Sequence, residues 1–119
     1  MAAPNLLAIS NITGKSASAN VTTSGANVIS NAASSGKVLK VNSLYITNVD
    51  GTNAADINVA LFRSSVFYHL ASAVTVPAKS AIVIIDKNSQ IYLEEGDGLT
   101  LSASTNGDLQ AVCSYEEIS

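Results

Sequence analysis

Hydrophobic and polar residues alternate along much of the chain from about residue 37 onward. The clearest case is the segment 56–63, where Ile57, Val59 and Leu61 share one face. A period of two residues is typical of a β-strand with one buried face. Similar patterns predict further strands over 37–49, 66–70, 99–103 and 109–115.

Turn sequences separate these segments. Asp50-Gly51-Thr52-Asn53 and Glu95-Gly96-Asp97-Gly98 have turn composition, Ser64-Ser65 predicts a tight connection, and Asn106-Gly107 is a signal for a type I′ hairpin. Pro77 is expected to end the ladder that precedes it. Short strands with turns about every 8–12 residues predict an all-β protein, an antiparallel β-sandwich of jelly-roll or Ig-like type.

One predicted strand differs from the others in pattern. The segment 81–86 contains the run Ala-Ile-Val-Ile-Ile, which is apolar on both faces. Continuous apolar runs of this length are typical of strands covered on both sides. We therefore expect a central, buried strand here.

Residues 1–36 differ in composition from the remainder, which we assign to a β-sandwich domain over 37–119. They are rich in Ser, Ala, Asn, Thr and Gly, and no helical period fits them. They are either a disordered leader or an extended polar arm or edge strand, with 20–30 as the candidate strand. We favour the second because β-branched residues recur and like-charge runs are absent.

The arm carries a few isolated apolar residues that could contact other proteins. Leu6, Leu7 and Ile9 form a cluster near its start, either a docking peg or the first strand of the domain. We predict that the assembly contacts of the arm are made by Leu6, Leu7, Ile9, Val21 and Val28.

Composition narrows the range of functions. The chain has 119 residues, enough for one domain, and 13% charged residues, about half the usual fraction for soluble domains. A weakly charged surface repels neighbouring molecules poorly, which suits a protein that packs against copies of itself or a partner. The net charge of −3 with a single arginine gives no basic stripe for nucleic acid. No apolar stretch approaches the ~20 residues of a membrane span, so we expect no membrane partner.

Few residues could perform chemistry. His69 is the only histidine and Cys113 the only cysteine, and no motif places a nucleophile beside a base. Glu94, Glu95 and Asp97 could ligate a hard cation, but they lack the spacing of an EF-hand loop, and the same holds for the loop at 50–56. We expect no catalytic residue, cofactor or metal, and a solvated acidic turn at 94–97.

Several segments of strand-and-turn sequence carry a resemblance to a known group of proteins. They are Lys40–Ile57, which contains Tyr-Ile-Thr-Asn-Val-Asp-Gly, together with 85–88, 92–97 and the C-terminal Cys-Ser-Tyr-Glu-Glu at 113–117. In these segments the chain resembles small virion structural proteins of marine tailed bacteriophages, notably those that infect cyanobacteria. The resemblance covers about residues 37–119 and implies a β-sandwich carried on the particle. It supplies no catalytic residues to transfer.

The expected function is therefore that of a non-enzymatic structural protein, made in the host cytoplasm and located in the virion. The leading hypothesis is a capsid decoration (cement) protein that binds the major capsid protein and self-associates, for instance as a trimer. One alternative is a tail, neck or fibre-attachment component that binds neighbouring tail proteins. Another is a carbohydrate-binding β-sandwich, which would use exposed aromatics such as Tyr45 or Tyr92.

Overall fold

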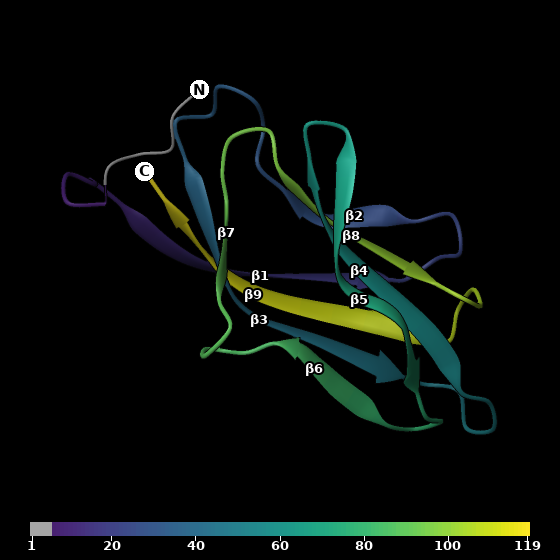
Figure 1. Cartoon of the computed structure of the whole chain (residues 1–119). Coiled ribbons are helices and arrows are strands. Elements are labelled where there is room, and N and C mark those ends of the chain that lie inside the picture. Colours follow the sequence, from purple (N-terminus) through teal and green to yellow (C-terminus); the bar gives the residue numbers. More distant parts are fainter. Residues whose placement is uncertain (1–5) are drawn as a thin grey trace.

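The computed structural model describes residues 6–119, which form nine β-strands and no helix (Figure 1). That part of the chain accordingly has no helix long and apolar enough to cross a membrane. The strands are β1 (Ile12–Asn20), β2 (Ala26–Ser30), β3 (Val38–Asn48), β4 (Ala55–Arg63), β5 (Val66–Val76), β6 (Ala81–Ile85), β7 (Ile91–Leu93), β8 (Gly98–Ala103) and β9 (Leu109–Ile118).

The strands form two antiparallel sheets, so the predicted β-sandwich is confirmed. One sheet, called sheet A, has the order β1-β9-β3-β6, and β7 pairs with β3. The other, sheet B, has the order β2-β8-β4-β5. β6 and β7 pair with successive parts of β3 and take the place of one interrupted strand. The resulting order is that of a jelly roll; in an Ig-like sandwich the first two strands would share a sheet.

The core between the sheets is aliphatic. Alternate residues of the central strands point inward, and the predicted inward face of β4 is confirmed by the complete burial of Ile57 and Val59. Among the described residues, no aromatic side chain is buried. The largest fully buried apolar side chains are Leu44, Ile46, Ile57, Ile85, Leu93, Leu99, Leu109, Val41, Val59 and Val76.

Residues 12–30 belong to both sheets. β1 pairs with β9 over its whole length, from Ile12 opposite Ile118 to Asn20 opposite Gln110, and β2 pairs with β8. The prediction of a single edge strand over 20–30 is wrong, because Asn20 ends β1 and a connection separates it from β2. Val21 in this connection is buried and closes that side of the sandwich.

The segment 81–86 is not a central strand, and that prediction is wrong. β6 ends at Ile85, pairs only with β3, and lies at the edge of sheet A. Its residues alternate in exposure, with Ile82 and Ile84 packed against the core and Val83 pointing to solvent. The apolar run reflects an apolar outer face rather than burial on both sides.

One of the predicted turns has the expected length, and another is longer than predicted. Ser64 and Ser65 form the expected two-residue connection between β4 and β5, and both have positive φ, 52° and 63°. The connection near Asn106-Gly107 instead spans five residues, 104–108, between β8 and β9. The side-chain oxygen of Asn106 accepts a hydrogen bond from the backbone N–H of Thr23 at 2.8 Å, which ties this longer loop to the β1–β2 connection.

The Ser64-Ser65 turn provides a prediction about stability. Two positive φ angles are those of a type I′ turn, which strongly favours Asn-Gly over Ser-Ser. The double variant Ser64→Asn/Ser65→Gly should raise the free energy of unfolding by about 0.5–1 kcal/mol. Urea denaturation followed by far-UV circular dichroism would measure it. The matched control Ser104→Gly should give no gain, and a destabilised double variant would contradict the turn assignment.

Two buried asparagines fasten the ends of β3 to neighbouring segments. Asn48 at the end of β3 is fully buried; its Nδ2 donates to the carbonyls of Asn53 (2.9 Å) and Val76 (3.0 Å), and its Oδ1 accepts from the N–H of Asp50. Asn31, just after β2, is also buried, and its Nδ2 donates to the carbonyls of Lys37 and Leu93. Both side chains satisfy groups that would otherwise be buried without partners.

Candidate interaction surfaces

The five residues predicted to make assembly contacts lie in different environments. Leu7 is 96% exposed, Leu6 is exposed, and Ile9 is partly exposed. Val28 is partly buried and packs against the core, whereas Val21 is 2% exposed and belongs to the core. The structure therefore brings Leu6 and Leu7 to the surface together and places Val21 away from it. The assembly role of these residues stays a prediction.

The segment that carries Leu6 and Leu7 is held against the end of sheet A. The backbone N–H groups of Ser10 and Asn11 both donate to the carbonyl of Ser119, at 2.7 and 2.9 Å. The N–H of Ser119 in turn donates to the carbonyl of Asn11 at 2.9 Å. These bonds fix the base of the exposed apolar pair, so the pair projects from a defined position.

An ion-pair cluster crosses sheet A close to this end. The ammonium groups of Lys37 (3.0 Å) and Lys15 (3.2 Å) both contact the carboxylate of Glu117 on β9. The hydrogen bonds from Lys37 and then Lys15 lower the pKa of Glu117. A carboxylate with a lowered folded-state pKa adds stability above its unfolded pKa, and this stability is lost as the pH falls through the folded pKa.

We therefore expect the free energy of unfolding to fall as the pH drops below about 4.5, with part of this fall due to Glu117. Glu117→Gln should cost at most about 1 kcal/mol at pH 7, because the pairs are partly exposed. The difference from the unmodified protein should shrink at pH 3. Chemical denaturation at both pH values would test this, with Glu116→Gln as the control; an unchanged difference would contradict it.

His69 and Cys113 lie far apart in the topology. His69 is exposed on β5, opposite Ala60 of β4, whereas Cys113 on β9 is fully buried. Burial raises the pKa of the Cys113 thiol to about 11. The thiol is thus neutral and shielded, and the structure does not bring it to the histidine. The described residues also include no group of three or more acidic, Cys or His side chains placed to hold a metal ion.

The acidic turn after β7 is organised by Arg63, which the sequence analysis did not connect with it. Arg63 lies at the end of β4; its Nε donates to Oδ1 of Asp97 at 2.9 Å, and its Nη2 bonds to Oδ2 of Asp97 and, at 3.1 Å, to Glu94. The hydrogen bonds that Arg63 donates to Asp97 raise the pKa of the guanidinium. Asp97 is only 4% exposed, so the prediction of a solvated turn is wrong for this residue.

The second acidic loop, at 50–56, is also accounted for by local hydrogen bonds. Asp50 accepts from the N–H of Thr52 at 2.8 Å and from the side chain of Asn53, and the first of these bonds is the main cause of its lowered pKa. Asp56 accepts from the hydroxyl of Thr75 on the adjacent strand β5. The carboxylates of this loop thus stabilise turn and strand pairing.

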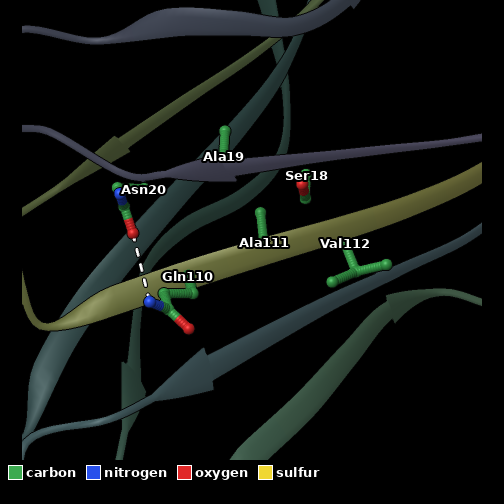
Figure 2. Close-up of a pocket in the computed structure, with 6 residues that line it drawn as sticks. All are labelled: Ser18, Ala19, Asn20, Gln110, Ala111 and Val112. Carbon is green, nitrogen blue, oxygen red and sulfur yellow. Dashed lines mark hydrogen bonds between the residues drawn. The ribbon is translucent and has the colours of Figure 1, made fainter.

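A shallow hollow of about 270 Å³ lies along β1 and β9 (Figure 2). Figure 2 shows its short side chains and the hydrogen bond between Gln110 Nε2 and Asn20 Oδ1, which is 3.2 Å long. The lining offers amide, hydroxyl and methyl groups but no acid, base or thiol. The residues are Ser18, Ala19, Asn20, Gln110, Ala111 and Val112.

A second hollow, of about 240 Å³, lies on the outer face of sheet B. It combines an exposed aromatic ring, Phe67, with His69 and with the hydroxyl side chains of Thr100 and Ser102. Asn58 at its edge already donates to Ser102 and accepts from the N–H of Ala73. This combination of a flat apolar ring with several hydroxyl and amide groups suits a neutral polar ligand better than a charged one.

The largest unexpected surface is the first half of β5. Five consecutive residues, Val66 to Leu70, are all exposed, although the strand alternates between two faces. Phe67 and Tyr68, which point to opposite faces, are 53% and 55% exposed. The alternation of this segment predicted a strand with one buried face. The prediction of a buried face is wrong for this segment, because Val66, Tyr68 and Leu70 are all exposed.

Comparisons with known protein families and with curated proteins identified no relative of this chain. No protein-family model matches the chain, and no curated protein is significantly similar to it.

Proposed function

We propose that this chain is a non-enzymatic structural protein of a bacteriophage virion, a capsid decoration protein that binds the outer shell and stabilises it. The observation that carries the proposal is the resemblance of residues 37–119 to small virion proteins of marine tailed phages. The jelly-roll order of the strands supports it, since jelly rolls are common in viral capsid and lectin domains.

The surfaces of the molecule favour packing over chemistry. The hollows along β1 and β9 and on sheet B are shallow, and the carboxylates of Asp50, Asp97 and Glu117 are engaged in a turn or in ion pairs. The exposed apolar pair Leu6 and Leu7 stands on a segment anchored to Ser119. Such a pair would suit a peg that enters an apolar depression of the major capsid protein.

Binding of the purified chain to isolated capsids tests this function. We expect saturable co-sedimentation with the capsids and a higher temperature of capsid disruption. Leu7→Asp should weaken binding at least tenfold without lowering the melting temperature of the chain. The matched control Val83→Asp, another exposed apolar residue, should bind normally. Absence of co-sedimentation would reject the decoration role.

The nearest alternative is a tail, neck or fibre-attachment component with the same fold. Copy number and position separate the two: immunogold labelling of intact particles would mark the whole shell for a decoration protein. Label confined to one vertex or to the tail would support the alternative and reject the decoration role.

A carbohydrate-binding function is a second candidate, favoured by the hollow on sheet B. Phe67 beside hydroxyl and amide groups is a combination that can stack on a sugar ring and bond its hydroxyls. Binding on a glycan array that is abolished by Phe67→Ala would support it. Loss on Tyr45→Ala or Tyr92→Ala would instead locate the site on sheet A.

A further inference from the structure

The edge strands of the two sheets are joined at both sides of the sandwich. At one side the edges β1 and β2 are joined by a short connection whose Val21 is buried. At the other side β5 and β6 are joined by a corner at Pro77–Ser80, where Val76 is buried. β5 begins at the β4–β5 turn and ends at this corner. In Figure 1 the turn lies apart from β6. The beginning of β5 therefore lies apart from β6.

The exposed segment Val66–Leu70 of β5 is a hydrophobic edge. β5 pairs only with β4, so its other backbone edge has no strand partner among the described residues. Natural edge strands are commonly blocked by Lys, Pro or bulges. The sequence Val-Phe-Tyr-His-Leu has neither Lys nor Pro, and the first bulge of β5 comes only at Leu70, because Ala60 pairs with His69 and Val59 with Ala71.

Both faces of this segment carry a large apolar side chain. Phe67 contacts Phe62 on the outer face, with ring centroids 4.7 Å apart, and Tyr68 lies on the inner face opposite Leu61. Arg63, the cation next to the turn, is already paired with Asp97 and Glu94. Arg63 and its two carboxylate partners leave a formal charge of −1 beside the turn, while Val66–Leu70 contains no Lys, Arg, Asp or Glu that would repel a second copy.

We infer that β5 pairs antiparallel with β5 of a second copy, which joins the two four-stranded sheets B into one continuous sheet across a two-fold axis. The exposed segment is centred on Tyr68, so Tyr68 lies opposite Tyr68 of the second copy. Phe67 then lies opposite His69 of the second copy. Both point to the outer face of sheet B, whereas Tyr68 of both copies points to the inner face, as antiparallel pairing requires, and the bulge at Leu70 ends the regular segment.

The apolar area available is consistent with a dimer. An aromatic side chain buries ~150–250 Å² when fully covered, so half-exposed Phe67 and Tyr68 offer about 100 Å² each. With the exposed parts of Val66, Leu70 and Val74 the apolar surface reaches roughly 400 Å² per copy, about half of the ~800 Å² per partner of a standard interface. The backbone edge and the polar atoms of the hairpin would supply the rest.

This inference specifies the self-association that the proposed function includes. Its test, however, requires only the purified chain. It predicts a two-fold dimer in place of the trimer considered from the sequence. If capsid binding fails while the dimer is found, only the decoration role is rejected. If the chain binds capsids but is monomeric alone, only the dimer is rejected.

Sedimentation equilibrium of the full chain at about 100 µM, well above a micromolar dissociation constant, tests the pairing. We expect a dimer that Tyr68→Lys and Val66→Lys each convert to monomer, with unchanged far-UV circular dichroism and melting temperature. Tyr45→Lys, an exposed tyrosine on sheet A, is the control and should remain dimeric. A monomeric unmodified chain, or a dimer insensitive to both β5 variants, would overturn the inference.

Disulfide trapping gives a second readout of the register. Tyr68→Cys should form a covalent dimer under mild oxidation, because the two introduced thiols face each other across the axis, within the ~4.5–5.5 Å Cβ separation of opposed residues. Tyr45→Cys should not, and Cys113 is too buried to interfere. Equal cross-linking of both variants, or of neither, would contradict the pairing.

Discussion

Replacing Asn48 by alanine should lower the free energy of unfolding by about 2–4 kcal/mol, the largest effect we expect for a polar substitution. The variant leaves the buried carbonyl of Val76 without its donor and removes the bonds to Asn53 and Asp50. Unsatisfied buried groups cost more than the bond itself contributes, because they lose their hydration as well. In a domain of this size the melting temperature should fall by roughly 10 °C. Differential scanning calorimetry would measure this directly.

Two further variants distinguish the hydrogen bonds from simple loss of volume. Asn42→Ala, on the same strand but only partly buried, is the control and should change stability by less than about 0.5 kcal/mol. Asn48→Asp keeps the shape but places a carboxylate against two carbonyl oxygens. Burial should raise the pKa of that introduced carboxyl, so the variant should recover stability as the pH falls. If Asn48→Asp were as stable as the original at pH 7, the assigned donors would be wrong.

Arg63→Ala should destabilise the protein by about 1–2 kcal/mol, less than a fully buried pair because the arginine is partly exposed. The variant leaves the buried carboxylate of Asp97 with only the N–H of Glu94 as a partner among the bonds described here. It also releases the β4–β5 turn from the β7–β8 turn. Hydrogen exchange should therefore accelerate most at the tip of this hairpin, while the amides of β3 and β9 keep their protection.

Arg63→Lys tests whether the geometry or only the charge is needed. Lysine keeps the charge but cannot hold both oxygens of Asp97 in the same fork, so it should restore less than half of the lost stability. Lys87→Ala removes an exposed cation elsewhere and should have little effect. Uniform acceleration of exchange throughout the molecule in Arg63→Ala would contradict a local role for this ion pair.

Strand prediction from the sequence succeeded where one face of the strand is buried by the opposite sheet. The alternation in 56–63 and in 109–115 corresponds to β4 and β9, both of which have neighbours on two sides. It was weakest at sheet edges. Between its two terminal residues β1 contains only small or polar residues. A strand at the margin of the core needs no large side chains, because backbone pairing with β9 holds it in the sheet.

The remaining differences arise from contacts between residues distant in sequence. Nothing near Arg63 indicates that Asp97, thirty-four positions later, will accept its hydrogen bonds. The apolar run of β6 gave no sign that one of its faces would remain exposed, because periodicity cannot distinguish a buried face from an apolar surface. Exposure of Leu6 and Leu7 was compatible with the predicted peg, but burial of Val21 depends on the crossover between the two sheets.

The aliphatic core has a practical consequence for spectroscopy. The chain has no tryptophan and four tyrosines, and Tyr45, Tyr68 and Tyr92 are exposed while Tyr115 is only partly covered. Intrinsic tyrosine emission should therefore change little when the core loosens, and far more when a surface near β5 or on the outer face of sheet A is covered. The native fluorophores are suited to measuring association, and loss of the folded state is better followed through the backbone.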